Sequence, residues 1–418
     1  MSAKIKTIKA EEILDSRGNP TLKVLAYSEN GYGAFAVPSG ASTGSHEAQE
    51  LRDGDPNYSR GLGVNKAIEK IDKIISPALL GIDVCDQKKI DSILLKLDGT
   101  DNKSTLGGNS VIGASIACAK AAANEEKVQL FEYLRGLENV LPSSSPTPLL
   151  FINLINGGKH ARTQLAFQEY LLIPQTDNVT EALQIGAKIQ QTLRDLVVGE
   201  FGSKTATMGD EGGLALHIES VKKPLELLME ALNKTENLAR ARLGLDVAAS
   251  SFYSNGIYSV EGKNFTSEML FDLHSKIIKD FNIFSVEDPF FEEDFGNFHK
   301  LLSKNPGLTV VGDDLTVTNS SRLYAAIKQK SINAVIIKPN QIGTVTETLG
   351  TMKLARENGI ECIVSHRSGE TMDDFIADLA FAFHCFGLKA GALGKPERDV
   401  KYNRLARISN LANKSTTA

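Results

Sequence analysis

Between residues 241 and 391 the chain repeats one pattern six times: ARLGLD (241–246), IFSVE (283–287), LTVVGD (308–313), AVIIK (334–338), ECIVSH (361–366) and GLKAG (387–391). Each segment is a short apolar run that ends in, or contains, a titratable residue. These residues are Asp246, Glu287, Asp313, Lys338, His366 and Lys389. Strands that are buried on both faces read as short runs rich in Val, Ile and Leu. The pattern therefore predicts parallel strands whose carboxyl ends meet at a shared mouth.

The spacing of these segments predicts a barrel. The last five recur every 23–28 residues, and a barrel of eight βα units takes about 250 residues in all. Two more strand-like runs, LLFINLI (149–155) and QEYLLIP (168–174), lie too close together for a helix between them. Helical periodicity follows at about 179–199 and 218–240. Two strands, two helices and six βα units give eight strands, which is the order β2α2(βα)6 of an α/β, TIM-like barrel.

The N-terminal third reads as a separate unit. Residues 4–37 alternate like strands, and residues 63–134 have helical periodicity. We therefore expect a small α+β domain over residues 1–140. The segment LPSSSPTP (141–148) is typical of a linker, and the barrel should occupy residues 149–408. We expect the tail, residues 409–418, to be disordered.

Composition restricts the classes of function. The 418 residues carry a formal net charge of −5, which argues against nonspecific binding to nucleic acids or to anionic membranes. The four cysteines form no CxxC pair. The first residues, MSAKIKTIKAEE, contain no apolar signal segment, and no apolar run approaches the ~18 residues of a membrane span. We expect a cytoplasmic protein that acts on a small molecule.

The three strand-end acids have two interpretations. Asp246, Glu287 and Asp313 could hold Mg²⁺, a hard cation that prefers oxygen ligands. They could instead cap the helices that follow, as aspartate often does. Because two lysines end later strands, we favour a metal site.

Lys338 and Lys389 are candidates for acid–base chemistry. Burial at the end of an apolar strand disfavours the ammonium, so the pKa of such a lysine falls and the amine can act as a base. The alternative is a lysine that only neutralises nearby acids or binds an anion.

Other candidates lie on loops. His366, Arg367 and Ser368 offer ring, guanidinium and hydroxyl groups before a helix, a combination that suits phosphate. Glu211 lies in the glycine-flanked turn MGDEGG (208–213). His160 and Glu169 could complete a hydrogen-bonded shell. Residues 39–44, SGASTG, read as a lid loop or a flexible connection.

Taken together, several strings resemble the enolase family, the phosphopyruvate hydratases. They include LDSRGNPT (14–21), VPSGASTG (37–44), INGGKHA (155–161), MGDEGG (208–213), VEDPF (286–290), VGDDLTVTN (311–319), VSHRSGET (364–371) and KYNRL (401–405). The resemblance implies the barrel described above, with the small α+β domain as its capping domain. It also implies the reversible dehydration of 2-phosphoglycerate to phosphoenolpyruvate, with two Mg²⁺ ions per site.

The resemblance further implies a role for each candidate. Lys338 resembles the base that removes the C2 proton, and Glu211 the acid that protonates the leaving 3-hydroxyl. Asp246, Glu287 and Asp313 resemble the ligands of the first metal, and Ser42 resembles a ligand of the second. Lys389 would bind the substrate carboxylate, and Arg367 and Ser368 the phosphate. The pocket would be lined by His160, Glu169 and His366.

The resemblance also bears on assembly. The family dimer pairs charges at positions that align with Glu11, Lys23, Glu397 and Arg407. Both N-terminal charges are reversed here and both C-terminal charges are kept, so we expect the family contact to be weakened in any homo-oligomer.

An alternative remains open from the sequence. A protein of this fold could be a binding or scaffold protein with little turnover. Retention of Lys338, Lys389, Glu211 and the acids favours an enzyme.

Overall fold

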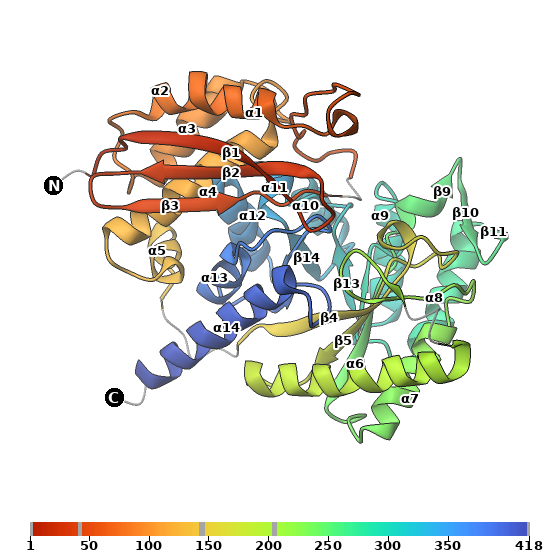
Figure 1. Cartoon of the computed structure of the whole chain (residues 1–418). Coiled ribbons are helices and arrows are strands. Elements are labelled where there is room, and N and C mark those ends of the chain that lie inside the picture. Colours follow the sequence, from red (N-terminus) through yellow and green to blue (C-terminus); the bar gives the residue numbers. More distant parts are fainter. Residues whose placement is uncertain (1–2, 41–43, 142–146, 203–206, 416–418) are drawn as a thin grey trace.

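The computed structural model describes residues 3–40, 44–141, 147–202 and 207–415. Figure 1 shows an N-terminal sheet with its helices beside a barrel that is surrounded by helices. The mixed α/β class and the barrel predicted from the sequence are confirmed.

The N-terminal domain is a three-stranded antiparallel meander covered by helices (Figure 1). Its strands are β1 (Thr7–Leu14), β2 (Pro20–Tyr27) and β3 (Tyr32–Ala36). Its main helices are α1 (Asn65–Lys70), α2 (Ser76–Leu79), α3 (Gln87–Asp98), α4 (Gly108–Glu125) and α5 (Leu130–Leu137). Helix α4 packs against β2 and β3. Its sequence is rich in small residues and nearly all of it is buried, so it lies close to the sheet.

The barrel is closed, because its last strand pairs with its first. Its eight strands are β4 (Leu149–Asn156), β5 (Glu169–Pro174), β8 (Ala241–Asp246), β12 (Ser285–Glu287), β13 (Thr309–Gly312), β14 (Ala334–Ile337), β15 (Glu361–Ser365) and β16 (Gly387–Lys389). Strand β5 runs antiparallel to both β4 and β8, and the remaining neighbours in the closed ring are parallel. The opening pair of adjacent strands is therefore confirmed. Two short strands, β6 (Thr207–Met208) and β7 (Leu214–Ala215), extend the sheet beside β4.

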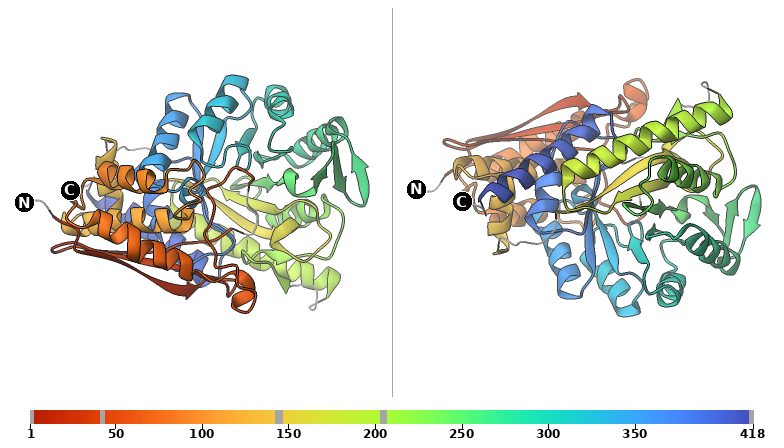
Figure 2. Two further views of the ribbon diagram at one scale, coloured as in Figure 1. Left: turned by 90° about the horizontal axis from the view of Figure 1, so that it is seen from above. Right: turned by 90° about the horizontal axis from the view of Figure 1, so that it is seen from below.

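Helices ring the barrel strands, as the two views in Figure 2 show. They are α6 (Val179–Phe201), α7 (Lys223–Lys234), α8 (Ser267–Phe281), α9 (Phe295–Lys304), α10 (Ser320–Gln329), α11 (Pro339–Ile342), α12 (Val345–Glu357), α13 (Phe375–Ala382) and α14 (Pro396–Ser415). A meander that the sequence analysis did not predict, β9 (Tyr253–Ser254), β10 (Ile257–Val260) and β11 (Lys263–Phe265), lies between β8 and α8. No helix of the described chain is both long enough and apolar enough to cross a bilayer.

The C-terminal tail differs from the expectation. Residues 409–415 of the expected tail continue helix α14, and residues 416–418 lie outside the described residues. The helix is anchored just before this point, because Leu405 and Ile408 are fully buried and Ser409 is largely buried. Once a helix is nucleated, each added residue costs little, so the polar residues that follow extend it.

The capping domain covers the carboxyl ends of the barrel strands. Backbone groups of Ser39 and Gly369 exchange two hydrogen bonds, of 2.8 and 2.9 Å. Ser45 Oγ donates to Glu292 Oε1 at 2.6 Å, and Asn340 Nδ2 donates to the carbonyl of Pro38 at 3.0 Å. These contacts place Pro38, Ser39 and Ser45 over the mouth of the barrel.

One buried carboxylate joins the two domains. Asp91 on α3 accepts from Ser115 Oγ at 2.6 Å and from the backbone N–H and hydroxyl of Thr346 at 2.8 and 2.6 Å. Thr346 lies in the first turn of α12, where backbone N–H groups have no partner within the helix. Asp91 therefore satisfies a helix end of the other domain.

We expect Asp91→Ala to lower the free energy of unfolding by about 1–3 kcal/mol, because buried donors on Ser115 and Thr346 lose their acceptor. The shift of the urea unfolding midpoint measures this loss. Lys73→Ala, which breaks only an exposed ion pair with Glu69, is the matched control and should leave the midpoint unchanged. Equal midpoints for the two variants would show that Asp91 does not join the domains.

Candidate active site

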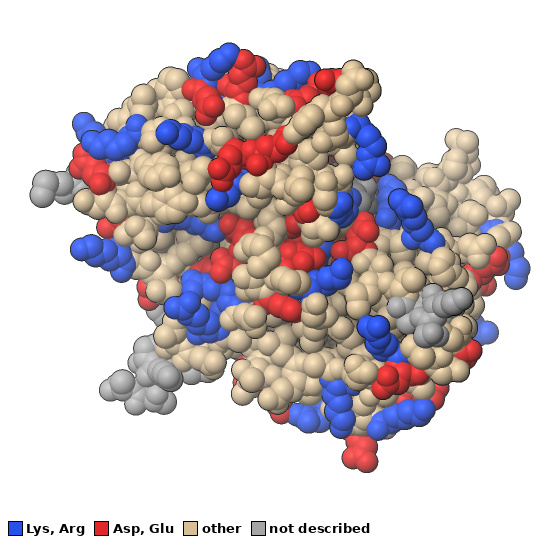
Figure 3. Space-filling view, in the orientation of Figure 1, with Lys and Arg blue, Asp and Glu red and all other residues tan. Residues whose placement is uncertain are grey.

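The titratable residues at the strand ends converge as predicted. A cavity lies at the mouth of the barrel. Of the residues predicted from the sequence, it is lined by His160, Glu169, Glu211, Asp246, Asp313, Lys338, His366, Arg367, Ser368 and Lys389. Figure 3 shows acidic and basic side chains together in the hollow at the centre of that face.

Strand register brings the first acids side by side. Glu169 pairs with Asp246 across β5 and β8, and Asp246 pairs with Glu287 across β8 and β12. The three carboxylates therefore occupy one row across three neighbouring strands. None of them caps a helix: α8 and α9 are capped by Thr266 and Asp294. The capping alternative thus fails for Asp246 and Glu287.

Lys389 is enclosed by this row. Its Nζ lies 3.0 Å from Asp246 Oδ2, 2.8 Å from Glu287 Oε2 and 3.1 Å from Glu169 Oε2. Burial alone would lower the pKa of Lys389, but the attraction of these carboxylates outweighs it and holds the pKa well above its ordinary value. Lys389 is therefore protonated, which suits binding of a carboxylate.

Lys338 is also protonated in this structure. It pairs with the carboxylate of Asp313, which in turn accepts from Gln341 Nε2 at 3.0 Å. Burial lowers the pKa of Lys338, but Asp313 raises it by more, so the net shift is upward. The expectation that burial would lower the pKa of both lysines is wrong here, because it left out their acidic partners. Lys338 can accept a proton only when Asp313 is engaged elsewhere.

Glu211 lies in a turn that only glycines allow. A Cβ on Gly209 or Gly213 would lie 2.6–2.7 Å from side-chain atoms of Asn156 on β4. This close approach presses the turn against the barrel. Asn153 Nδ2 then donates to Glu211 Oε2 at 2.8 Å.

Glu211 and Glu169 share His160 between them. His160 Nδ1 lies 3.4 Å from Glu169 Oε1 and 3.4 Å from Glu211 Oε1. Burial lowers the pKa of His160, but Glu211 outweighs this and raises it to about 10. Burial also opposes ionisation of Glu211, yet the charge on His160 keeps the pKa of Glu211 well below its ordinary value. Burial and repulsion from Glu211 raise the pKa of Glu169 to about 7.

His160 is therefore protonated at neutral pH, and Glu169 is also protonated below about pH 7. Glu211 itself is ionised. A role for Glu211 as an acid requires that a neighbour in this cluster supply the proton.

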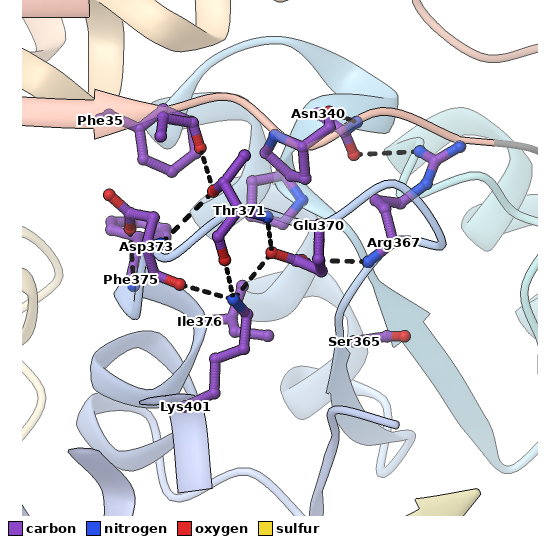
Figure 4. Close-up of a pocket in the computed structure, with 13 residues that line it drawn as sticks. Phe35, Asn340, Ser365, Arg367, Glu370, Thr371, Asp373, Phe375, Ile376 and Lys401 are labelled. Carbon is purple, nitrogen blue, oxygen red and sulfur yellow. Dashed lines mark hydrogen bonds and ion pairs between the residues drawn. The ribbon is translucent and has the colours of Figure 1, made fainter. Parts of the chain in front are cut away.

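Arg367 is held by two domains. Its Nη2 lies 2.9 Å from Glu47 Oε2 of the capping domain, and its Nη1 donates to Asn340 Oδ1 at 3.0 Å. Glu370 lies between Arg367 and Lys401 in Figure 4. It accepts from the Arg367 backbone N–H at 3.2 Å and from the Lys401 ammonium at 2.7 Å. An anion that binds Arg367 must therefore compete with Glu47.

One group of acids, which includes Asp313 but neither Asp246 nor Glu287 of the predicted trio, could hold a cation. Carboxylate oxygens of Asp288, Asp313 and Asp314 lie within 4.8 Å of one another. Among the described residues, Glu287 Oε1 is buried without a hydrogen-bond partner. Burial, together with repulsion from Asp313, raises the pKa of Asp314 to about 8. The site has an excess of negative charge, which a bound divalent cation would neutralise.

Several contacting residues escaped the sequence analysis. They are Glu47, Asn153, Gln168, Asp288, Asp314, Gln341 and Arg398. Asp288 and Asp314 directly follow two predicted strand-end acids, so the doubled acidic patterns ED and DD were a usable signal. Arg398 is 30 to 32 residues from the loop residues it contacts, and no local pattern indicates it. Ser42, the predicted second-metal ligand, lies outside the described residues.

Comparisons with known proteins agree with this geometry. Residues 5–134 match the model of the enolase N-terminal domain, and residues 144–417 match that of the enolase C-terminal TIM barrel domain. The enolase of Methanocaldococcus jannaschii is 44% identical over 406 residues, which cover 97% of this chain and 94% of that protein. The enolase of Methanothrix thermoacetophila is 43% identical over 418 residues, which cover 100% and 98%. The chain therefore belongs to the enolase family of carbon–oxygen lyases.

Proposed function

We propose that this protein catalyses the reversible dehydration of 2-phosphoglycerate to phosphoenolpyruvate. One observation carries the proposal: Lys338 and Glu211, a potential base and a potential acid, line one buried cavity from different segments of the chain. Removal of a proton at C2 and loss of hydroxide at C3 need two such groups, placed apart. A scaffold protein has no need of this arrangement.

The substrate is recognised by its two anionic ends. Lys389, which is protonated beside its three carboxylate partners, binds the carboxylate next to the C2 proton. Arg367 and Ser368 bind the phosphate, and Glu47 holds the guanidinium in place until the phosphate arrives. His366 and His160 line the space between the two ends.

Lys338 is the base. A C2 proton beside a carboxylate is weakly acidic, because its removal doubles the negative charge on one small group. Asp313 keeps Lys338 protonated while the two are paired, so the amine becomes a base when Asp313 turns to another partner.

The acid is the unit formed by Glu211, His160 and Glu169, with Glu211 as the group that delivers the proton. His160 carries a proton at neutral pH and contacts both carboxylates. His160 can therefore protonate Glu211 again without water entering the cavity.

We propose two Mg²⁺ ions as cofactors. Asp246, Glu287 and Asp313 would hold the first, with Asp288 and Asp314 beside them, and Ser42 would help to hold the second. Bound Mg²⁺ would stabilise the doubly charged enolate more strongly than the substrate, which lowers the barrier and does more than tighten binding. We further propose that residues 1–140 form the capping domain and 149–408 the barrel, and that the enzyme works in the cytoplasm.

The direct test is the ultraviolet absorbance of phosphoenolpyruvate formed from 2-phosphoglycerate, measured with and without Mg²⁺. We expect turnover that depends on the metal. A flat trace from correctly folded protein with Mg²⁺ would exclude the proposed reaction and favour the scaffold alternative.

We expect Lys338→Ala and Glu211→Gln to separate the two proton transfers. Lys338→Ala should abolish exchange of the C2 proton with solvent deuterium and reduce kcat by roughly 10²- to 10⁴-fold. Glu211→Gln should reduce dehydration to a similar extent yet leave the exchange measurable. NMR of 2-phosphoglycerate in D₂O follows the exchange. Glu69→Gln, at an exposed ion pair, is the control. If Lys338→Ala still exchanges the proton, the base has been misassigned.

We expect the affinity for Mg²⁺ to rise with pH. Asp314 has a pKa of about 8, and burial beside Asp246 holds the pKa of Glu287 well above its ordinary value. Both groups are thus neutral at low pH and must lose protons to bind a cation. Affinity should increase from pH 6 to pH 8.5, with net release of protons. Calorimetry in buffers of different ionisation enthalpy measures both quantities. Affinity that stays constant over this range would contradict the assignment of these carboxylates.

We expect the homodimer typical of the family to be weakened. Glu11 and Lys23 face each other across β1 and β2 and form an exposed ion pair of 2.9 Å within the chain. In the family contact, each would face a like charge, Glu397 or Arg407, on a second copy. Sedimentation at micromolar concentration and physiological salt should show monomer, and Glu11→Arg combined with Lys23→Glu should restore the dimer. A stable dimer of the natural chain would refute this expectation.

A further inference from the structure

Arg398, in the first turn of α14, is a buried guanidinium that joins three parts of the site. The residue has no exposed surface. Its Nη1 donates to the carbonyl of Arg367 at 2.6 Å, and its Nη2 donates to the carbonyl of Ser368 at 2.7 Å and to that of Asp210 at 3.3 Å. Nη1 also lies 2.6 Å from Nδ1 of His366.

The last contact fixes where the ring proton of His366 lies. Arginine carries only N–H donors and remains protonated in proteins. Nδ1 of His366 must therefore accept the hydrogen bond. A neutral imidazole has one N–H, and with Nδ1 as acceptor the proton must lie on Nε2.

Nε2 of His366 faces the acid unit. It lies 3.4 Å from Glu211 Oε1 and, among the described residues, makes no hydrogen bond, and His366 is almost completely buried. Burial, with repulsion from Arg398, also keeps the pKa of His366 well below its ordinary value. The ring therefore carries its single proton towards the Glu211 carboxylate at neutral pH. His160, on the same oxygen of Glu211, differs because its ring is cationic.

We propose that Arg398 is a positioning residue that holds His366 as the Nε2–H tautomer, so that the ring N–H faces Glu211 and Nε2 cannot accept a proton from it. Protons then reach Glu211 from His160 and Glu169 and not through His366. The kinetic consequence rests on the proposed function, whereas the tautomer itself does not.

A neighbouring buried cation provides the matched comparison. Lys401 lies three residues further along α14 and also holds the loop after β15. Its Nζ donates to the carbonyls of Thr371 and Asp373 at 2.8 and 2.7 Å and pairs with Glu370 at 2.7 Å, as Figure 4 shows. It makes none of the described contacts with His366. Lys401→Met thus loosens the same loop without touching the tautomer.

The test is nitrogen-15 NMR of the Mg²⁺-loaded full chain, labelled at its seven histidines. The His366 signal is assigned by its loss in His366→Gln. The unsubstituted protein should show a protonated Nε2 and an unprotonated Nδ1. Arg398→Lys, which keeps one charged donor, should preserve this pattern, as should Lys401→Met. Arg398→Met should shift His366 towards the Nδ1–H form.

Kinetics supply the second readout. Arg398→Met should lower kcat for dehydration about tenfold or more and shift its pH profile, and Arg398→Lys should restore part of both. Lys401→Met should act mainly on KM, through the Arg367 loop. A protonated Nδ1 in the unsubstituted protein would overturn the inference even if no variant folds. So would an unchanged tautomer and pH profile in Arg398→Met. Absence of turnover by the unsubstituted enzyme would instead refute the proposed function, and the NMR result would still stand.

Discussion

The ammonium of Lys389, buried among three carboxylates, is the interaction on which the mouth of this barrel depends. Strand register places Glu169, Asp246 and Glu287 in one row, and a row of buried like charges is tolerable only with a cation against it. Lys389 lies within 3.1 Å of all three. The lysine is therefore needed to assemble the site before it binds anything.

The same arrangement leaves the site short of positive charge. Lys338 pairs with Asp313, yet Asp288 and Asp314 lie beside it, and their pKa values are raised by burial and mutual repulsion. Such a site takes up protons or divalent cations. The protonation of Lys338 is tied to that choice through its ion pair with Asp313.

The sequence predicted the architecture and much of the site for a clear reason. Strands buried on both faces have a recognisable composition, and a barrel forces their ends together, so Asp246, Lys338 and Lys389 could be placed at its mouth from the sequence alone. Sequence reasoning failed where partners decide the outcome: the pKa of Lys338 rises because of Asp313. Arg398 was missed because its contacts with His366 and Ser368 join distant segments. The helical end of α14 was missed because buried Leu405 and Ile408, not the polar tail, decide it.

The central claim is that Asp313 controls the charge on Lys338. The most direct measurement is the pKa of Lys338, from NMR of the chain labelled at the lysine side-chain carbon next to Nζ, with and without Mg²⁺. We expect a pKa of Lys338 above the ordinary value of lysine in the metal-free protein and a clear fall in that pKa when Mg²⁺ is added. A Lys338 pKa that is already low without the metal, or that does not respond to it, would show that Asp313 does not control the charge on Lys338.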